Sequence, residues 1–173
     1  MVKALFSLWQ NDRNADVAII GGRPHHMDSL FKEEVSNISE ASIMSDYFIK
    51  IGRETKIENV PAITVVDGTR NTEDDICEVM KLSQYYDHIT VIAMSFRLFR
   101  VQLLAQDFVR KNEKFSDELS RMIFRDAEQF LPDMFDNFVK MNQSAAYART
   151  MLQERQGVMA KLCGSNEEYI RTA

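Results

Sequence analysis

The sequence contains only two cysteines among its 173 residues, Cys77 and Cys163. They lie far apart, so they match neither a metal-ligand spacing nor a disulfide framework. We therefore expect a reducing, cytoplasmic location. Because Cys77 falls at a predicted buried position of a helix, we interpret it as a small core side chain rather than as a catalytic thiol.

Long apolar runs and an excess of positive charge are also missing. No apolar run approaches the roughly 20 residues that span a bilayer. Residues 1–10 have neither the sustained apolar core nor the small-residue cleavage site of a secretory signal. The 21 basic residues are outnumbered by 26 acidic ones, giving a formal net charge of -5 without a basic arm or tail. We therefore expect no membrane span and no general binding of DNA or RNA.

Hydrophobic residues make up 45% of the chain, which is typical of a globular protein with one ordinary core. Strand and helix signals alternate over residues 1–112. Short apolar runs predict strands at 17–20, 62–66 and 89–93, and helical spacing predicts helices over 2–10, through 41–51, through 76–80 and from 101 to about 111. Gly52 is the predicted end of the second helix. Strands separated by helices predict a three-layer α/β domain with a small parallel sheet.

The pattern changes after residue 112. Leu119, Met122, Ile123 and Ala127 recur at helical spacing, and Pro132 restarts the chain before another apolar stripe. A last helix is predicted over 144–162. Because no Gly/Ser-rich linker precedes this part, we interpret residues 113–173 as an all-helical subdomain that packs on the α/β domain. Its aromatic stripes are interpreted as core rather than as a partner-binding face.

In an open parallel sheet, ligands bind beyond the carboxyl ends of the strands. Four arginines and a histidine pair follow the three predicted strands, namely Arg23, Arg70, Arg97, Arg100, His25 and His26. Each loop also leads into a helix whose first N–H groups attract anions. This edge therefore predicts a pocket for an anionic or nucleotide-like small molecule, which the backbone at Gly21 and Gly22 can approach closely. The alternative is that the arginines are solvated or pair with surface carboxylates.

Other residues near this edge allow a structural and a functional interpretation. Asn37 or Ser39 can cap the helix that contains Glu40, and Asn37 and Glu40 have the spacing of a capping box. Thr72 and Asp75 have the same spacing at the start of the next helix. Glu40 and Asn71 therefore either satisfy helix starts or contact a ligand. A weaker alternative is a phosphate-processing hydrolase that uses His25, His26 and a metal. The sequence has no Gly-x-Ser-x-Gly motif, no Gly-Lys-Ser/Thr loop and no convincing general base, so the catalytic residues stay undetermined.

Four motifs occur in order along residues 1–112: Ile20-Gly21-Gly22, Ser39-Glu40-Ala41 with Gly52, Asn71-Thr72-Glu73-Asp74-Asp75, and Met94-Ser95-Phe96-Arg97-Leu98-Phe99-Arg100-Val101. This set resembles the YdcF-like family, the bacterial group that contains SanA and ElyC. The resemblance implies a Rossmann-type fold, and one member of the family binds S-adenosylmethionine, while others are linked to envelope and peptidoglycan physiology. It also implies pocket residues, carried over by position: Gly21, Gly22, Glu40, Asn71, Thr72 and Arg100.

The chain departs from the family pattern at several points. Ile20 replaces the usual serine, Asp74-Asp75 replaces Glu-Asn, and Arg97 replaces a histidine. The first strand of the family would precede the helix predicted over 2–10, and this sequence does not contain it. An uncovered strand edge of this kind favours self-association into a homo-oligomer, or completion by another chain.

Together the charge pattern and the resemblance predict a ligand-binding set without a metal: Gly21, Gly22, Arg23, Glu40, Asn71, Thr72, Ser95, Arg97 and Arg100. The leading hypothesis is a cytoplasmic protein that binds a nucleotide-like ligand, with S-adenosylmethionine as the best candidate cofactor. If the protein is an enzyme, group transfer is expected, with arginines stabilising negative charge. The alternative is a non-enzymatic regulatory or interaction protein, a shortened family member whose pocket has degenerated.

Overall fold

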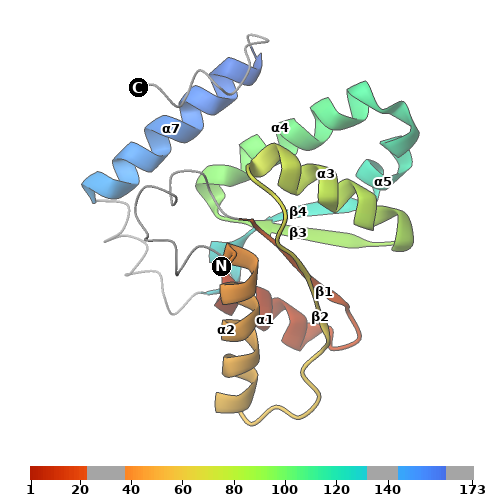
Figure 1. The fold of residues 1–173 in the computed structure, drawn as a ribbon, viewed down its shortest axis with the longest axis vertical. Coiled ribbons are helices and arrows are strands. Elements are labelled where there is room, and N and C mark those ends of the chain that lie inside the picture. The colour runs from red at the N-terminus through yellow and green to blue at the C-terminus, as the bar shows by residue number, and fades with distance from the viewer. Residues whose placement is uncertain (23–37, 132–143, 163–173) are drawn as a thin grey trace.

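The computed structural model describes residues 1–22, 38–131 and 144–162 and shows a mixed α/β protein (Figure 1). The elements in chain order are α1 (Val2–Asn11), β1 (Val17–Ile20), α2 (Glu40–Glu54), β2 (Ile63–Val66), α3 (Thr72–Leu82), η3 (Ser83–Tyr85), β3 (Ile89–Ala93), α4 (Ser95–Lys111), η4 (Glu113–Phe115), α5 (Ser116–Ser120), β4 (Met122–Asp126), η5 (Ala127–Phe130) and α7 (Ala145–Leu162). None of the helices in these ranges combines the length and hydropathy that a membrane crossing requires.

The strands form two separate parallel pairs. β1 pairs with β2, with Val17 opposite Ile63, and β3 pairs with β4, with Ile89 opposite Met122. The three predicted strands and the parallel direction within each pair are confirmed. The prediction of one three-stranded sheet is wrong, because β1 and β3 share no ladder and a fourth strand is present.

β4 lies in the stretch for which the sequence predicts a helix. Its side chains alternate: Met122 is buried, Ile123 is exposed and Phe124 packs against the core. A short apolar run such as this fits a strand as well as one turn of a helix, and pairing with β3 selects the strand. The prediction of an all-helical part after residue 112 is therefore wrong, and the α/β architecture continues to Asp126.

The first two helices bury an aromatic cluster against β1. The predicted helix over 2–10 is confirmed as α1, and it buries Phe6 and Trp9. Their rings meet Phe48 of α2 edge-on, at centroid distances of 5.0 and 5.9 Å. Gly52 does not end α2 as predicted. The helix continues to Glu54. Gly52 instead leaves room for the Val60 side chain, because a Cβ added at this position would lie 2.4 Å from Val60 Cγ2.

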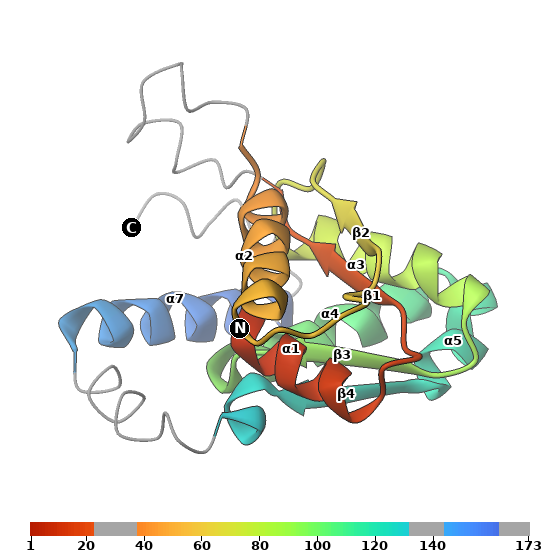
Figure 2. The ribbon, with the colours of Figure 1, turned by 90° about the horizontal axis from the view of Figure 1, so that it is seen from below.

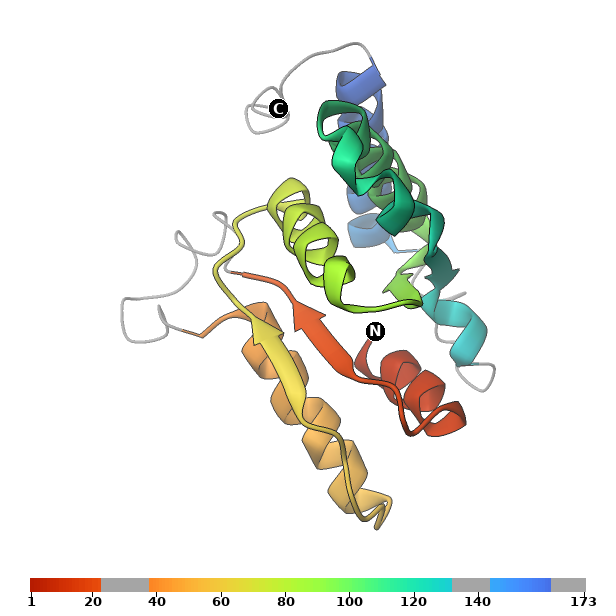
Figure 3. The same cartoon turned by 90° about the vertical axis from the view of Figure 1, so that its right-hand side faces the viewer.

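The described core consists of two clusters of buried side chains rather than one. The cluster from α1, β1 and α2 includes Phe6, Ile19 and Phe48. The cluster from α3, β3, α4 and β4 includes Met80 and Leu104. Figures 2 and 3 show the strands in the spatial order β2, β1, β3, β4, with α1 and α2 together and α3 and α4 together. Each pair of strands therefore has a core of its own.

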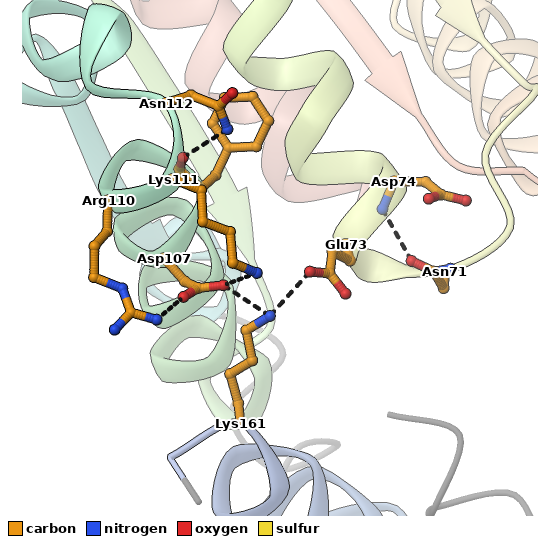
Figure 4. Close-up of polar contacts among 9 residues, drawn as sticks. Asn71, Glu73, Asp74, Asp107, Arg110, Lys111, Asn112 and Lys161 are labelled. Carbon is orange, nitrogen blue, oxygen red and sulfur yellow. Dashed lines mark hydrogen bonds and ion pairs between the residues drawn. The ribbon is translucent and has the colours of Figure 1, made fainter. Parts of the chain in front are cut away.

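The predicted last helix is confirmed as α7, and it packs along α4. A cluster of charged side chains fastens its carboxyl-terminal end (Figure 4). Lys161 Nζ lies 2.8 Å from Asp107 Oδ2 of α4 and 2.9 Å from Glu73 Oε1 of α3. Asp107 also forms ion pairs through Oδ1 with Arg110 Nη2 at 2.6 Å and through Oδ2 with Lys111 Nζ at 2.8 Å. Because the Asp107 and Lys161 side chains are only 10% and 15% exposed, this cluster links three helices where solvent screening is weak.

Candidate functional site

The predicted site lies where β1, β2 and β3 end and the loops lead into α2, α3 and α4. The predicted ligand-binding residues within the described ranges lie at these strand ends or in the first two turns of these helices, namely Gly21, Gly22, Glu40, Asn71, Thr72, Ser95, Arg97 and Arg100. Arg23, His25 and His26 lie outside the described residues.

The glycine pair after β1 is engaged with the backbone of the protein itself. The Gly21 carbonyl accepts the Ala41 N–H at 2.9 Å, and the Gly22 carbonyl accepts the Glu40 N–H at 3.1 Å. A Cβ on Gly22 would stand 1.4 Å from the Thr69 carbonyl oxygen, whereas one on Gly21 would meet its nearest atom at 3.6 Å. The close approach that Gly22 permits therefore joins the loops after β1 and β2.

Side chains and carbonyls of the protein also occupy N–H groups at the starts of α2 and α3. Ser39 Oγ accepts the Ser42 N–H at 3.0 Å, which confirms the predicted cap. Asn71 Oδ1 accepts the Asp74 N–H at 2.9 Å (Figure 4), so Asn71 is the N-cap of α3. Thr72 is the first helical residue rather than the cap that the Thr72-to-Asp75 spacing predicts. The structure thus assigns a capping role to Asn71.

Asp75, which was predicted only as a capping residue, lies between the groups at this edge. Its Oδ1 is buried and accepts no hydrogen bond from the described residues. Burial raises the pKa of Asp75, the carboxylates of Glu40 and Asp74 raise it further, and the nearby Thr69 and Arg97 side chains partly oppose them. Glu40 from α2 and Arg97 from α4 therefore both act on one carboxyl group of α3. In the sequence, the only feature that indicates this carboxyl group is the acidic run at the start of α3, to which Asp75 belongs.

Replacing Asp75 with asparagine is expected to raise the free energy of unfolding by about 1 kcal/mol at pH 7, because the ionised form is buried without a full set of partners. A carboxyl whose folded pKa is raised destabilises the folded state at pH values above that pKa. The penalty disappears below the ordinary value of 3.8. Urea unfolding of the wild type and of Asp75→Asn, at pH 7 and again below the ordinary pKa, measures the difference in the free energy of unfolding. This difference should vanish at the lower pH.

The control for this substitution is Asp46→Asn, which removes the same charge from an exposed position of α2. It should change the free energy of unfolding by less than about 0.5 kcal/mol at either pH. A loss of stability in Asp75→Asn at pH 7 would contradict the interpretation, since the ionised carboxylate would then be stabilising.

The start of α4 holds two carboxylates that come from distant parts of the chain. Ser95 donates its backbone N–H to both Glu128 oxygens, at 3.0 and 3.1 Å, and its hydroxyl to Oε1 at 2.9 Å. Arg97 Nε and Arg100 Nη1 each lie 3.2 Å from Glu154 of α7, whose side chain is only 9% exposed. Ser95, Arg97 and Arg100 thus hold carboxylates of the protein itself. Sequence reasoning missed both partners, because neither is near α4 in the chain.

Cys77 is half-buried on α3 and lines a shallow hollow of about 420 Å³ together with Gly68, Thr69 and Lys81. Burial raises the pKa of the Cys77 thiol, and the carboxylates of Glu73 and Asp74 raise it further. A raised pKa lowers the thiolate fraction, so a nucleophilic role for Cys77 is disfavoured.

Within the described part of the chain, no group of three or more His, Cys, Asp or Glu side chains could hold a metal ion. The predicted alternative with His25, His26 and a metal falls outside these residues. Comparisons with protein-family models, with curated proteins and with solved structures find no match to this chain. The resemblance to the YdcF-like family therefore stays a prediction.

Proposed function

We propose that the protein binds an anionic, nucleotide-like small molecule at the start of α4. The observation that carries this proposal is the pair of carboxylates already bound there, Glu128 on Ser95 and Glu154 on the two arginines. A carboxylate or phosphate group of a ligand can make the same contacts with a helix N–H, a hydroxyl and a guanidinium.

In this proposal Glu128 is an internal competitor for the ligand. It lies on η5, and its contacts with Ser95 are exposed to solvent. A ligand anion displaces it and takes the Ser95 N–H and hydroxyl. The Arg97 side chain, 49% exposed, can turn toward the ligand, while Arg100 at 15% stays on Glu154 and keeps α4 against α7.

S-adenosylmethionine is the first candidate, because its amino-acid carboxylate fits these donors and the predicted family includes a protein that binds it. The parallel direction of the strands within each pair supports the same edge, since open parallel sheets bind ligands beyond the carboxyl ends of their strands. If a group is transferred, Arg97 would stabilise the negative charge that develops.

Isothermal titration with S-adenosylmethionine, ATP and inorganic phosphate tests the proposal. We expect Ser95→Ala and Arg97→Gln each to weaken binding about tenfold, since each removes one hydrogen bond to a charged group. Glu128→Gln should strengthen binding severalfold, because a neutral amide competes less well for the Ser95 donors. Arg53→Gln, which removes the same charge from the last turn of α2, is the matched control and should leave binding unchanged.

The second candidate function is a non-enzymatic regulatory or interaction protein. The observation that favours it is again the occupied donor set, because Glu128 and Glu154 satisfy groups that a ligand would need. If neither the wild type nor Glu128→Gln binds any of the three probes at millimolar concentration, ligand binding at α4 is refuted. Equal losses in Arg97→Gln and Arg53→Gln would show only attraction to the general charge of the protein.

A further inference from the structure

A groove with a volume of about 340 Å³ lies between α4 and α7. The two helices pack side by side and run in the same direction (Figure 1). The Phe96 ring near the start of α4 meets the Tyr147 ring near the start of α7, with the centroids 5.5 Å apart. Near the other ends of the helices, Lys161 pairs with Asp107. The groove is lined by five apolar side chains, namely Phe96, Phe99, Met151, Val158 and Met159.

These apolar side chains belong to helix faces that the hydrophobic core does not use. On α4, Leu104 and Ala105 are buried in the core cluster, whereas Phe99 is 61% exposed. Of the α7 residues that the structure describes, none belongs to either core cluster, and Met159 is 58% exposed. Apolar side chains that gather at a groove in this way mark a binding site more often than scattered exposed ones do.

The charged side chains that line the groove are two arginines and one glutamate, Arg100, Arg155 and Glu154. The Glu154 carboxylate is already held by Arg97 and Arg100, each at 3.2 Å. Arg155 is exposed and forms no ion pair with the residues that the structure describes. Although the whole chain has a formal net charge of -5, this groove therefore offers a guanidinium to an incoming anion.

The size of the groove fits a small molecule better than a protein partner. Its volume of about 340 Å³ lies at the lower end of the range of about 300–1,000 Å³ for small-molecule sites. A stable protein interface takes about 20–30 residues on each side, whereas eight residues line this groove. Met151 and Met159 are eight positions apart on α7, which corresponds to about 12 Å along the helix. An extended hydrocarbon chain of about that length can lie between the two helices.

We propose that the groove between α4 and α7 binds a single-chain amphiphile with an anionic head group, of the class of the medium-chain fatty acids. The hydrocarbon chain packs against Phe99, Met151 and Met159, and the carboxylate pairs with Arg155. Methionine suits such a site, because its flexible side chain adapts to a ligand without a fixed shape. The Ser95 donors take no part in this contact, so the proposal does not depend on the anion site at the start of α4.

Isothermal titration of the full chain with free fatty acids below their micelle concentrations tests the proposal. Decanoate should bind about tenfold more tightly than octanoate, because two more methylene groups leave water. Dodecanoate should add less than about threefold, since its chain extends beyond the groove. Decanol, which has the same chain length as decanoate and no charge, should bind about fivefold more weakly than decanoate.

Two leucine and methionine variants of α7 separate the groove from apolar surface in general. Met159→Ser removes a lining side chain and should weaken the binding of decanoate about fivefold. Leu152→Ser removes a side chain that is 56% exposed on the same helix but does not line the groove. Its affinity for decanoate should stay within about twofold of the wild type. Both side chains are largely exposed, so both variants should fold.

A second pair of variants tests the recognition of the head group. Arg155→Gln should weaken the binding of decanoate about fivefold and leave the binding of decanol unchanged, because only the carboxylate pairs with the guanidinium. Arg149→Gln, which removes the same charge from another exposed position of α7, is the matched control. It should leave the affinity for both compounds within about twofold of the wild type.

Four results would overturn the proposal. An absence of decanoate binding up to its micelle concentration would show that the groove takes no amphiphile. Equal losses in Met159→Ser and Leu152→Ser would show adsorption to any apolar surface. Binding to anionic phospholipid vesicles that Met159→Ser weakens, without binding of free decanoate, would assign this face to a membrane surface. A dimeric mass that Met159→Ser makes monomeric, again without decanoate binding, would assign it to a second copy of the chain.

Discussion

The substitution Gly22→Ala is expected to lower the free energy of unfolding by about 3 kcal/mol or more, or to prevent folding, because overpacking against backbone is not easily relieved. The new Cβ would stand 1.4 Å from the Thr69 carbonyl oxygen and 2.4 Å from the carbonyl carbon. Neither atom can move without displacing the loop after β2. Circular dichroism during urea unfolding gives the difference in stability.

The neighbouring glycine provides the control. Gly21→Ala places its Cβ 3.6 Å from the nearest atoms, the Ala41 nitrogen and the Glu40 Cβ, which is an ordinary contact. We expect it to change the free energy of unfolding by less than about 1 kcal/mol. If both variants are equally stable, the loops after β1 and β2 do not meet at Gly22, and the packing of these strand ends described above is wrong.

The second large effect is expected at Asp107. Asp107→Asn should lower the free energy of unfolding by about 2 kcal/mol at pH 7, because it removes the anion on which Lys111, Lys161 and Arg110 converge. Lys161 is the least exposed of these three cations, so most of the loss should come from its contact. Chemical unfolding of the full chain measures the change.

The effect at Asp107 should depend on pH in a definite direction. Burial alone would raise the pKa of Asp107, but hydrogen bonds from Lys111, Lys161 and Arg110 outweigh it and hold the pKa well below the ordinary value of 3.8. A depressed carboxyl pKa stabilises the folded state above the ordinary value, and this contribution is lost as the pH falls through the folded pKa. The wild type should therefore lose stability below about pH 4 more steeply than Asp107→Asn.

Asp117→Asn is the matched control, since Asp117 is exposed on α5. Its stability should stay within about 0.5 kcal/mol of the wild type at neutral pH. Parallel pH profiles for the wild type and Asp107→Asn would contradict the account, because the cluster would then contribute nothing that depends on the charge of Asp107.

Much of the local structure could be predicted from residue patterns. The aromatic and aliphatic spacing of α1, the Ser39 cap of α2 and the apolar runs of β1 and β3 each carry their signal within a few residues. Helices and short buried strands respond to such local periodicity and capping. Gly52 was misread because a glycine near the end of a helix resembles a cap, whereas its role depends on the position of Val60.

The candidate site likewise has some features that local patterns predict and others that they do not. Local reasoning brought Ser95, Arg97 and Arg100 to one helix start, but their partners Glu128 and Glu154 come from residues 33 and 54 positions away. No pattern within a helix or a loop identifies a carboxylate at that separation. Whether an arginine binds a ligand or a side chain of the protein is therefore decided by packing.

By itself, the sequence determined that α1, α2, α3, α4 and α7 are helices, which apolar runs become the first three strands, and that charged residues gather at the strand ends. Only the tertiary structure decided that residues 122–126 form a strand, that the strands separate into two pairs, and that Glu154 and Asp107 hold α7 in place. The physical reason is the separation along the chain over which each kind of interaction acts. Hydrophobic periodicity and capping act over a few residues, whereas strand pairing and buried ion clusters join groups that only the folded chain brings together.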